Sequence, residues 1–318
     1  MVTNQLQPSV CISILNWNNA DETLHCLESL KKINQSNVRI IVLDNGSTDD
    51  SIQKLQVQSG FELITSATNL GFAGGHNKII QYALDHDFKY VWLLNNDALV
   101  AEKCLEHLTD HAEQHTEGAL FSPVIKNLSP PHKLQHVISL LNATQTGVEE
   151  YLDIDIAREL QQEQPDKIIL WGTALFLRCS AVKHIGLLDE KLFAYSEDTD
   201  YSMRSIKNGY RNQIVFNAEI LHHQPVGPRK PHYYYYTQRN GFLTWKKYVS
   251  FKDLMRLARW NLQLARKLKA DIPGQIDAIS ALKLGIWHGW TNRGGPYNSQ
   301  EKLGVFPTLL VNSFLAIS

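Results

Sequence analysis

Short apolar runs alternate with amphipathic stretches along the first hundred residues of the chain. The apolar runs are residues 10–15, 38–43, 61–65 and 90–94. Runs of this length that are bounded by polar residues are typical of buried strands. The stretches between them place apolar residues at helical spacing, as Leu24, Leu27 and Leu30 do. Strands that alternate with helices predict an α/β fold with a mainly parallel, doubly wound central sheet flanked by helices.

The predicted strands end in polar side chains. Asp44 follows the second strand, and Asn95, Asn96 and Asp97 follow the fourth. The carboxyl ends of parallel strands share one edge of a sheet, where such sheets bind their ligands. Asp44 could accept a hydrogen bond there from the ring N–H of a pyrimidine base, and Asp97 could ligate Mg²⁺ or Mn²⁺ beside nucleotide phosphates. A turn followed by a helix cap is the alternative explanation of residues 95–97.

A glycine-rich segment follows the third strand, at residues 69–77. Gly71, Gly74 and Gly75 would let the backbone approach a diphosphate closely, and the N-terminus of the next helix favours anions. A flexible turn is the alternative, because the spacing differs from the GxGxxG pattern of dinucleotide folds. Taken together, the three polar strand ends predict nucleotide binding.

Composition and charge narrow the class of protein. With 43% hydrophobic and 20% charged residues, the chain has the composition of a soluble globular protein. A net charge of −1 gives no general attraction to nucleic acid. The four cysteines form no CxxC pair, the N-terminus lacks a signal-peptide pattern, and no apolar run is long enough to span a bilayer. We therefore expect a cytoplasmic protein with free thiols.

The region from about residue 9 to about residue 248 resembles the family 2 glycosyltransferases, which are inverting enzymes with a GT-A fold. The motifs that carry the resemblance are residues 14–18, 44–49, 69–77 and 95–97. The resemblance implies that Asp97 holds a Mn²⁺ or Mg²⁺ ion, although Asn95 replaces the first carboxylate of the family's Asp-x-Asp motif. It also implies a set of residues that line the nucleotide-sugar, with the first stacked on the base: Trp17, Asp44, Asn69, Gly71, Asn77 and Asn96.

Three carboxylates, those of Glu197, Asp198 and Asp200, lie within four residues. They repel one another unless a cation or a proton relieves them. A helix N-terminus, where acids are stabilising, is the alternative reason for the cluster. Residues 186–204 also match the family's Glu-Asp-x-Asp segment, which implies that Asp198 is the general base that deprotonates the acceptor hydroxyl. The other two acids are expected to orient the acceptor or to pair with Arg204.

Two further segments add candidate residues. Residues 214–223 predict a strand that ends in two histidines, and the resemblance places the family's metal-binding histidine at His222 rather than at His223. An imidazole beside a carboxylate and a diphosphate suits Mn²⁺ at least as well as Mg²⁺. Residues 168–177 are predicted to form one strand, in which Gly172 indicates close approach by a ligand or a neighbouring chain.

The chain is expected to divide into a transferase domain and an extension. We expect a GT-A glycosyltransferase domain over residues 1–248 and a helical C-terminal extension over residues 249–318. Within the first domain, the nucleotide-sugar half covers about 9–125 and the acceptor half about 126–248. The four tyrosines at 233–236 either stack on sugars or pack against the sheet.

The C-terminal extension begins with a predicted capping box at Ser250 and Asp253. The helix that follows is expected to bury Phe251 on its apolar face. Its opposite face is basic and contains Lys252, Arg256, Arg259, Arg266, Lys267 and Lys269. That face is either solvated or docks peripherally on anionic lipid or on the diphosphate of a lipid-linked acceptor. Residues 285–295 resemble a glycine- and arginine-containing signature of such transferases, and the apolar chain end could pack, form a homo-oligomer or touch a membrane.

Within the family the chain most resembles bacterial rhamnosyltransferases. That resemblance implies dTDP-L-rhamnose as the donor and a polysaccharide or lipid-linked saccharide as the acceptor. One alternative is transfer from a UDP-sugar, either a hexose or galactofuranose. Another is a non-catalytic subunit that binds a nucleotide-sugar and scaffolds a polysaccharide assembly complex, an interpretation supported by the missing carboxylate at Asn95. Asp198 and His222 favour the enzyme.

Overall fold

The computed structural model describes residues 9–33, 37–142, 147–224, 227, 229–257, 259, 263 and 276–316. The chain divides into two units. The first comprises residues 1–140, 149–188 and 201–225, and the second comprises residues 141–148, 189–200 and 226–318. The expected domain boundary at residue 248 stays a prediction.

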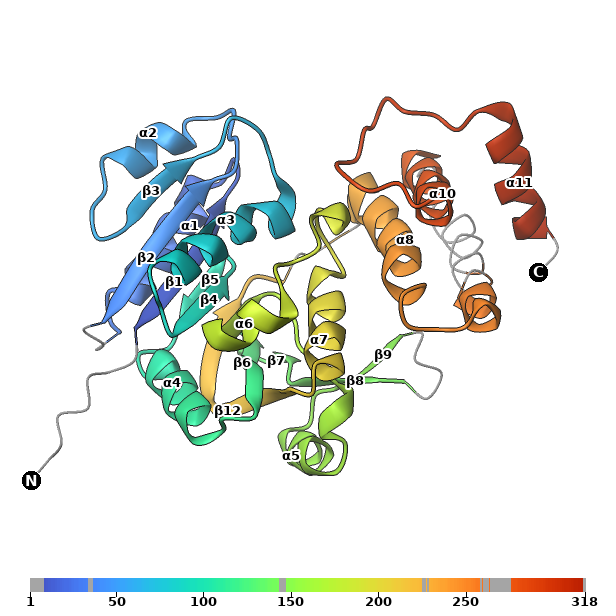
Figure 1. The fold of residues 1–318 in the computed structure, drawn as a ribbon. Coiled ribbons are helices and arrows are strands. Elements are labelled where there is room, and N and C mark those ends of the chain that lie inside the picture. Colours follow the sequence, from blue (N-terminus) through green and yellow to red (C-terminus); the bar gives the residue numbers. More distant parts are fainter. Residues whose placement is uncertain are drawn as a thin grey trace, which may run out of the picture. The chain divides into compact units, whose positions relative to one another are not determined.

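Four parallel strands form one side of the central sheet in the first unit. In the order β3, β2, β1, β4 they are Glu62–Thr65, Val38–Asp44, Val10–Asn16 and Tyr90–Leu94. The helices that follow β1, β2 and β3 are α1 (Ala20–Leu30), α2 (Ser51–Gln56) and α3 (Gly71–Asp85). The register aligns Asn16 with Asp44, so polar residues end both strands at one edge of the sheet (Figure 1). The predicted parallel, helix-flanked arrangement is confirmed here.

Beyond β4 the sheet becomes mixed. β11 (Ala174–Arg178) lies antiparallel between β4 and β6 (Gly118–Asn127). β12 (Arg211–His222) runs parallel to β6, and β5 (Ala98–Val100) pairs antiparallel with β12. β7 (Leu134–His136) pairs antiparallel with β6 near its end, at Ile125 and Lys126.

A small second sheet and four helices complete this part of the chain. The small sheet has the order β10 (Ile168–Ile169), β8 (Ile138–Leu141) and β9 (Val148–Tyr151). The helices are α4 (Cys104–Gln114), α5 (Ile154–Glu163), α6 (Cys179–Ile185) and α7 (Glu197–Lys207). Short 3-10 turns occupy Pro165–Lys167 and Glu190–Leu192.

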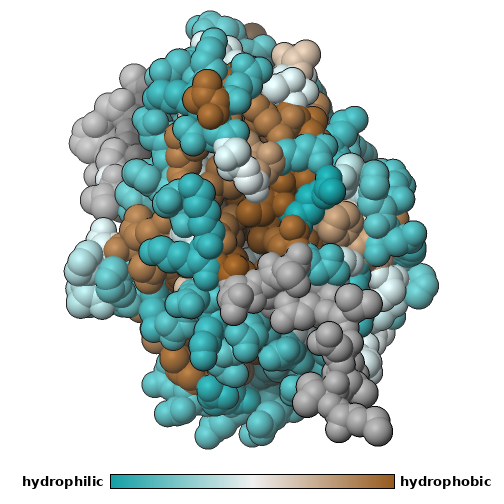
Figure 2. Space-filling model, turned by 90° about the vertical axis from the view of Figure 1, so that its left-hand side faces the viewer, coloured by the Kyte–Doolittle hydropathy of each residue, from teal (hydrophilic) through white to brown (hydrophobic). Residues whose placement is uncertain are grey.

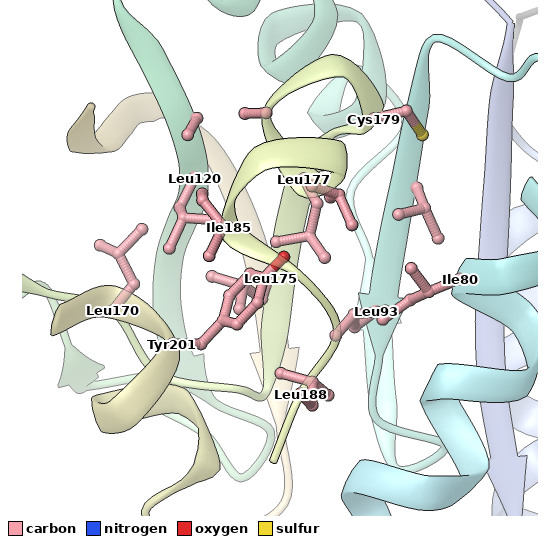
Figure 3. Packing of buried hydrophobic residues seen from close by; sticks show 14 of the residues in the cluster. Ile80, Leu93, Leu120, Leu170, Leu175, Leu177, Cys179, Ile185, Leu188 and Tyr201 are labelled. Carbon is pink, nitrogen blue, oxygen red and sulfur yellow. The ribbon is translucent and has the colours of Figure 1, made fainter. Parts of the chain in front are cut away.

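Helices cover both faces of the central sheet. Successive residues of a strand point to opposite faces. On one face Leu93 of β4 lies beside Ile80 of α3, and Ile185 of α6 belongs to the same buried cluster (Figure 3). On the other face Trp92 packs with residues of α1 and α4 that include Leu27. Because both faces are buried, the polar groups of β1, β2 and β4 gather at the ends of these strands.

The structure differs from the predictions at two glycine-containing segments. Residues 168–177 form the two strands β10 and β11 instead of one, and Gly172 lies in the turn between them. The glycine-rich segment is not a loop, because α3 already begins at Gly71. A Cβ atom at Gly75 would lie 2.9 Å from the side chain of Leu15. Gly75 therefore allows the first turns of α3 to pack closely against β1.

The second unit is mainly helical. Its principal helices are α8 (Pro231–Trp245), α10 (Ile276–Trp290) and α11 (Val305–Ala316). Phe242 of α8 and Leu282 of α10 belong to one buried cluster with Val311 of α11. Three of the four consecutive tyrosines, at 234–236, are buried within this unit, so packing accounts for them.

The start of the C-terminal extension confirms one prediction and corrects another. Ser250 Oγ accepts a hydrogen bond from the Asp253 N–H at 3.3 Å, as expected for a capping box. Phe251, which was expected to be buried, is 69% exposed, and Leu257 occupies a buried position of this helix instead. Phe251 lies in the first helical turn, next to the ring of Trp290. Lys252, Arg256 and Arg259 are exposed, whereas Arg266, Lys267 and Lys269 lie outside the described residues.

Much of the face that Figure 2 shows is hydrophilic. On the face in Figure 2, apolar side chains gather near the middle and hydrophilic ones surround them. Within the described part of the chain, none of the helices combines the length and the hydropathy that crossing a membrane requires.

Candidate functional site

The predicted metal ligands Asp97 and His222 lie side by side. Asp97 immediately precedes β5, and His222 is the last residue of β12. The antiparallel register of these two strands aligns His222 with Ala98. As a result, Asp97 Oδ1 lies 3.2 Å from His222 Nε2, and both side chains keep some exposure, at 27% and 12%. A strand pair formed by residues far apart in sequence thus creates this carboxylate–imidazole pair.

Two amide side chains surround the imidazole of His222. Gln135 Oε1 lies 3.1 Å from Nδ1, and Asn95 Nδ2 lies 3.3 Å from Nε2. When Gln135 accepts the Nδ1–H, the lone pair is left on Nε2, which is the atom that faces Asp97. A partner on the outer nitrogen orients an imidazole for metal binding in this way. The sequence analysis missed Gln135, since the uneven polar stretch around it has no periodicity that would single it out.

The donor set of this pair fits Mn²⁺ or Mg²⁺ that is also bound by phosphate. A carboxylate oxygen and an imidazole nitrogen supply two ligands, and such ions commonly complete their shell with substrate phosphates and water. Among the residues that the structure describes, no group of three His, Cys, Asp or Glu side chains is arranged to hold a metal ion. The protein would therefore supply only part of the coordination shell.

A chain of hydrogen bonds joins the ends of β4, β1 and β2. Asn96 Nδ2 donates to Thr23 Oγ1 at 2.9 Å, and the Thr23 hydroxyl donates to Asn16 Oδ1 at 2.8 Å. Asn16 Nδ2 donates in turn to Asp44 Oδ2 at 2.7 Å. Ser47 donates its backbone N–H and its hydroxyl to the same carboxylate. Asn16 ends a strand inside a recognised motif and Thr23 lies on the buried side of α1, but neither was selected from the sequence.

The residues predicted to contact the base differ in how available they are. Trp17 follows β1 and is 54% exposed. Asp44 is fully buried, and both of its oxygens accept the hydrogen bonds described above. A base N–H would therefore have to share or displace one of these donors. Asn18 links the loop after β1 to the loop after β2, because its side-chain oxygen accepts the Thr48 N–H at 2.7 Å.

Side-chain amides hold the backbone at the start of α3 through hydrogen bonds. Asn69 Oδ1 accepts the Gly71 N–H at 2.8 Å, and Asn45 spans the same segment by binding Leu70 N–H and Gly71 C=O. Asn77 is buried, and its amide bonds both the N–H and the C=O of Leu188 at 2.9 Å. The predicted contact of Asn77 with a nucleotide-sugar would require these two bonds to open. The predicted contacts of Asn69, Gly71 and Gly172 stay predictions.

The acidic cluster lies at the start of α7, in the second unit. Asp198 Oδ1 accepts the Thr199 N–H at 2.7 Å. Asp200 binds Lys247 Nζ at 2.9 Å, and the same Lys247 binds Asp189 at 2.7 Å. Burial alone would lower the pKa of Lys247, but the two carboxylates outweigh it and raise the pKa. Lys247 is thus a cationic partner of the cluster that the sequence did not reveal.

Glu197 is the unusual member of the cluster. Its side chain is 5% exposed, and its Oε2 atom has no hydrogen-bond partner among the described residues. Burial raises the pKa of Glu197 well above its usual range, and the adjacent charge of Asp198 raises it further. A carboxyl group that is neutral at physiological pH can donate a hydrogen bond, which a carboxylate cannot.

We expect Glu197→Gln to change the pH dependence of stability. In the folded protein Glu197 stays protonated, whereas in the unfolded chain it ionises near its usual pKa of 4.5. The wild type therefore loses stability as the pH rises above that value, by about 1.4 kcal/mol per unit until the folded pKa is reached. Gln cannot ionise, so urea unfolding should show the variant gaining on the wild type as the pH rises above about 5.

The control for this comparison is Glu102→Gln, which makes the same substitution at an exposed position. We expect the difference in unfolding free energy between Glu102→Gln and wild type to stay constant over the same pH range. Parallel curves for Glu197→Gln would show that Glu197 is ionised in the folded protein.

Comparison with known proteins adds to this geometry. The model of glycosyl transferase family 2 matches residues 9–186, which is more than half of the chain. An N-acetylglucosaminyl-diphospho-decaprenol L-rhamnosyltransferase of Mycobacterium tuberculosis is 27% identical over 219 residues, which cover 62% of this chain and 70% of the relative. The low-salt glycan biosynthesis hexosyltransferase Agl10 of Haloferax volcanii is 23% identical over 92% of this chain and 95% of its own. The dTDP-rhamnosyl transferase RfbF of Shigella flexneri is 21% identical over 74% of this chain and 79% of its own.

A solved structure has the same fold. The structure of residues 1–349 of S. aureus TarS in complex with UDP-GlcNAc superposes with a TM-score of 0.58 and 13% sequence identity, covering 88% of this chain and 80% of that chain. Together with the family match, this likeness confirms the GT-A fold expected from the sequence, with its mixed, mostly parallel sheet and C-terminal helices.

Proposed function

The chain belongs to the family 2 glycosyltransferases, and we propose that it is an inverting, metal-dependent enzyme that moves a sugar from a nucleoside diphosphate to a hydroxyl acceptor. The observation that supports this proposal most is the Asp97–His222 pair, 3.2 Å apart at a polar edge of the sheet. A carboxylate and an imidazole at such an edge suit a divalent ion that also binds phosphate.

The donor is proposed to bind along the polar strand ends of the first unit. The exposed ring of Trp17 stacks on the base, while Asp44 and Asn96 define the two ends of the hydrogen-bonded chain beneath it. The N-terminus of α3, which Asn69 and Gly71 shape, directs the positive end of a helix dipole to the diphosphate, while the N–H groups of Leu70 and Gly71 stay bonded to side-chain oxygens.

Charge on the departing diphosphate has to be neutralised. Asp97 and His222 would hold a Mn²⁺ or Mg²⁺ ion, which supplies Lewis-acid neutralisation of that charge when bound, so that no general acid is needed. Gln135 orients the imidazole of His222 through Nδ1, and the ion would take the place of the Asn95 amide, which lies 3.3 Å from Nε2.

The acceptor hydroxyl has to lose its proton. Inverting transfer is a single displacement through an oxocarbenium-like transition state. Asp198 takes the proton in this step, and Glu197 orients the acceptor with its buried carboxyl group. A positioned base of this kind contributes about 10²–10⁴-fold.

The donor sugar is proposed to be L-rhamnose from dTDP-L-rhamnose, and the acceptor a polysaccharide or lipid-linked saccharide. Two relatives support the sugar through their names, the M. tuberculosis L-rhamnosyltransferase and the S. flexneri dTDP-rhamnosyl transferase. The first also supports a diphospho-lipid acceptor. A UDP-sugar is the second candidate, because TarS binds UDP-GlcNAc and a galactofuranosyltransferase of M. tuberculosis is 26% identical to this chain over 219 residues.

Hydrolysis of the donor tests the proposal without a known acceptor. Release of nucleoside diphosphate is measured for dTDP-L-rhamnose, UDP-glucose, UDP-GlcNAc and UDP-galactofuranose, with Mn²⁺, with Mg²⁺ and with EDTA. We expect turnover of dTDP-L-rhamnose that EDTA abolishes. If only a UDP-sugar is turned over, the proposed donor dTDP-L-rhamnose is wrong. If turnover continues in EDTA, the proposed metal dependence is wrong. Binding without turnover of any donor would favour a non-catalytic subunit.

A further inference from the structure

The loop before the acidic cluster has a strained backbone. Phe193 adopts φ 64° and ψ −63°, and the Ala194 N–H donates to Leu192 C=O at 2.7 Å. These values define the rarer, strained form of the γ-turn. Tyr195 and Ser196 then adopt φ values of 68° and 67°. Left-handed backbone is unfavourable for residues other than glycine, so this conformation persists only where its surroundings enforce it.

The amide of Asn240 captures the carbonyl groups of this loop. Its Nδ2 atom lies 2.9 Å from Leu192 O, 2.7 Å from Ala194 O and 2.6 Å from Tyr195 O. Asn240 is fully buried in α8, so its amide is held in place to meet these carbonyl groups. The two hydrogens of this amide are thus shared among the carbonyl groups of three residues of the strained loop, Leu192, Ala194 and Tyr195.

Arg239 completes the contact. Its Nη2 donates to Leu192 O at 2.6 Å and to Lys191 O at 3.3 Å, and its Nε donates to Asn240 Oδ1 at 2.8 Å. The guanidinium also bonds Gly295 C=O, and it lies 5.1 Å from the ring of Tyr235. Arg239 is fully buried. A buried cation that binds main-chain oxygen atoms is costly to place, and it fixes geometry more than it adds stability.

Two glycines of the C-terminal segment pack against the backbone of Arg239 and of the loop that it binds. A Cβ atom at Gly289 would lie 2.7 Å from Arg239 O, and one at Gly294 would lie 2.6 Å from Lys191 O. Backbone therefore packs directly on backbone at both places. This contact gives a physical reason for the glycines in the segment 285–295.

We propose that Arg239 and Asn240 are positioning residues that hold loop 191–196 so that α7 begins at Glu197 with Asp198 in a fixed place. The first bond of that helix, from Asp200 N–H to Ser196 C=O at 2.9 Å, starts from the last strained residue of the loop. The inference rests on the proposed role of Asp198 as the base. A base that is displaced by about 1 Å can lose on the order of 10²-fold in rate.

The test compares Asn240→Ala with Leu282→Ala. Both changes weaken the second unit, since Leu282 is buried between the helices, but only the first removes contacts of the loop. At a temperature where both variants are folded by circular dichroism, we expect kcat of Asn240→Ala to fall about 10–100-fold below that of Leu282→Ala, with KM for the donor unchanged. Asn240→Ser replaces Asn240→Ala in this comparison when the alanine variant does not fold.

Hydrogen exchange gives a readout that needs no substrate. Peptides that cover residues 191–200 should exchange faster in Asn240→Ala than in Leu282→Ala at equal global stability. Equal kcat values, or equal exchange in these peptides, would overturn the positioning role. If Asp198→Asn keeps its turnover, the proposed base is wrong; if Asp198→Asn is inactive while Asn240→Ala has normal kcat, only the positioning role is wrong.

Discussion

Replacing Asp198 by Asn is expected to lower kcat by about 10²–10⁴-fold while the donor still binds. Asn has the same shape and can accept the Thr199 N–H that Asp198 accepts at 2.7 Å, so the start of α7 should keep its conformation. The amide cannot take up a proton, so the acceptor hydroxyl attacks without general-base assistance. Steady-state release of nucleoside diphosphate gives kcat, and calorimetry with the unreacted donor gives its affinity.

Asp253→Asn is the matched control for this change. It makes the same substitution in the second unit, at a carboxylate that accepts the Ser250 hydroxyl at 2.6 Å and pairs with Arg256. Its kcat should stay within about 2-fold of the wild type, since surface substitutions of this kind have small effects. A similar kcat for Asp198→Asn and Asp253→Asn would remove Asp198 from the mechanism.

Replacing Asp97 by Asn or His222 by Ala is expected to abolish metal-stimulated turnover. A metal ion that stabilises a leaving group contributes several kcal/mol, and each 1.36 kcal/mol is tenfold in rate, so a loss of about 10²-fold or more is expected. Activity is titrated with Mn²⁺, and Mn²⁺ binding in the presence of nucleoside diphosphate is followed by electron paramagnetic resonance. Both variants should show weaker binding as well as slower turnover.

His223→Ala controls for the loss of a histidine at the end of β12. His223 follows His222 directly and is exposed. We expect its Mn²⁺ titration to match that of the wild type. If His223→Ala loses metal binding and His222→Ala keeps it, the ligand assignment between the two neighbours would be reversed.

The sequence predicts the strand ends well because burial leaves a clear trace there. β1, β2 and β4 are covered on both faces, so they appear as continuous apolar runs, and their polar ends stand out as Asn16, Asp44 and Asn95. The chain order of these runs and helices also defines the parallel side of the sheet. The pairing of Asp97 with His222 is different, because it depends on β5 lying against β12, two segments that are far apart in the sequence. It could be anticipated only through the family resemblance.

Other features have no local signature. The glycines at 71, 74 and 75 lower helix propensity, yet α3 begins there, and Gly75 packs closely against the side chain of Leu15. Arg239 and Asn240 donate hydrogen bonds to main-chain oxygen atoms, and every residue has a main-chain carbonyl group whatever its side chain. Their partners therefore cannot be recognised from sequence, even though the Arg-Asn pair itself can be noticed.

The hydrogen-bonded chain from Asn96 to Asp44 has a consequence for how related sequences diverge. Each donor along it points the same way, from Asn96 through Thr23 and Asn16 to a carboxylate that only accepts. Loss of the Thr23 hydroxyl would leave Oδ1 of the fully buried Asn16 without this donor, which is costly for a buried group. In related sequences, we therefore expect a change at one of these positions to be accompanied by changes at its hydrogen-bond partners. Serine, which keeps the hydroxyl, is the single replacement for Thr23 that should be tolerated.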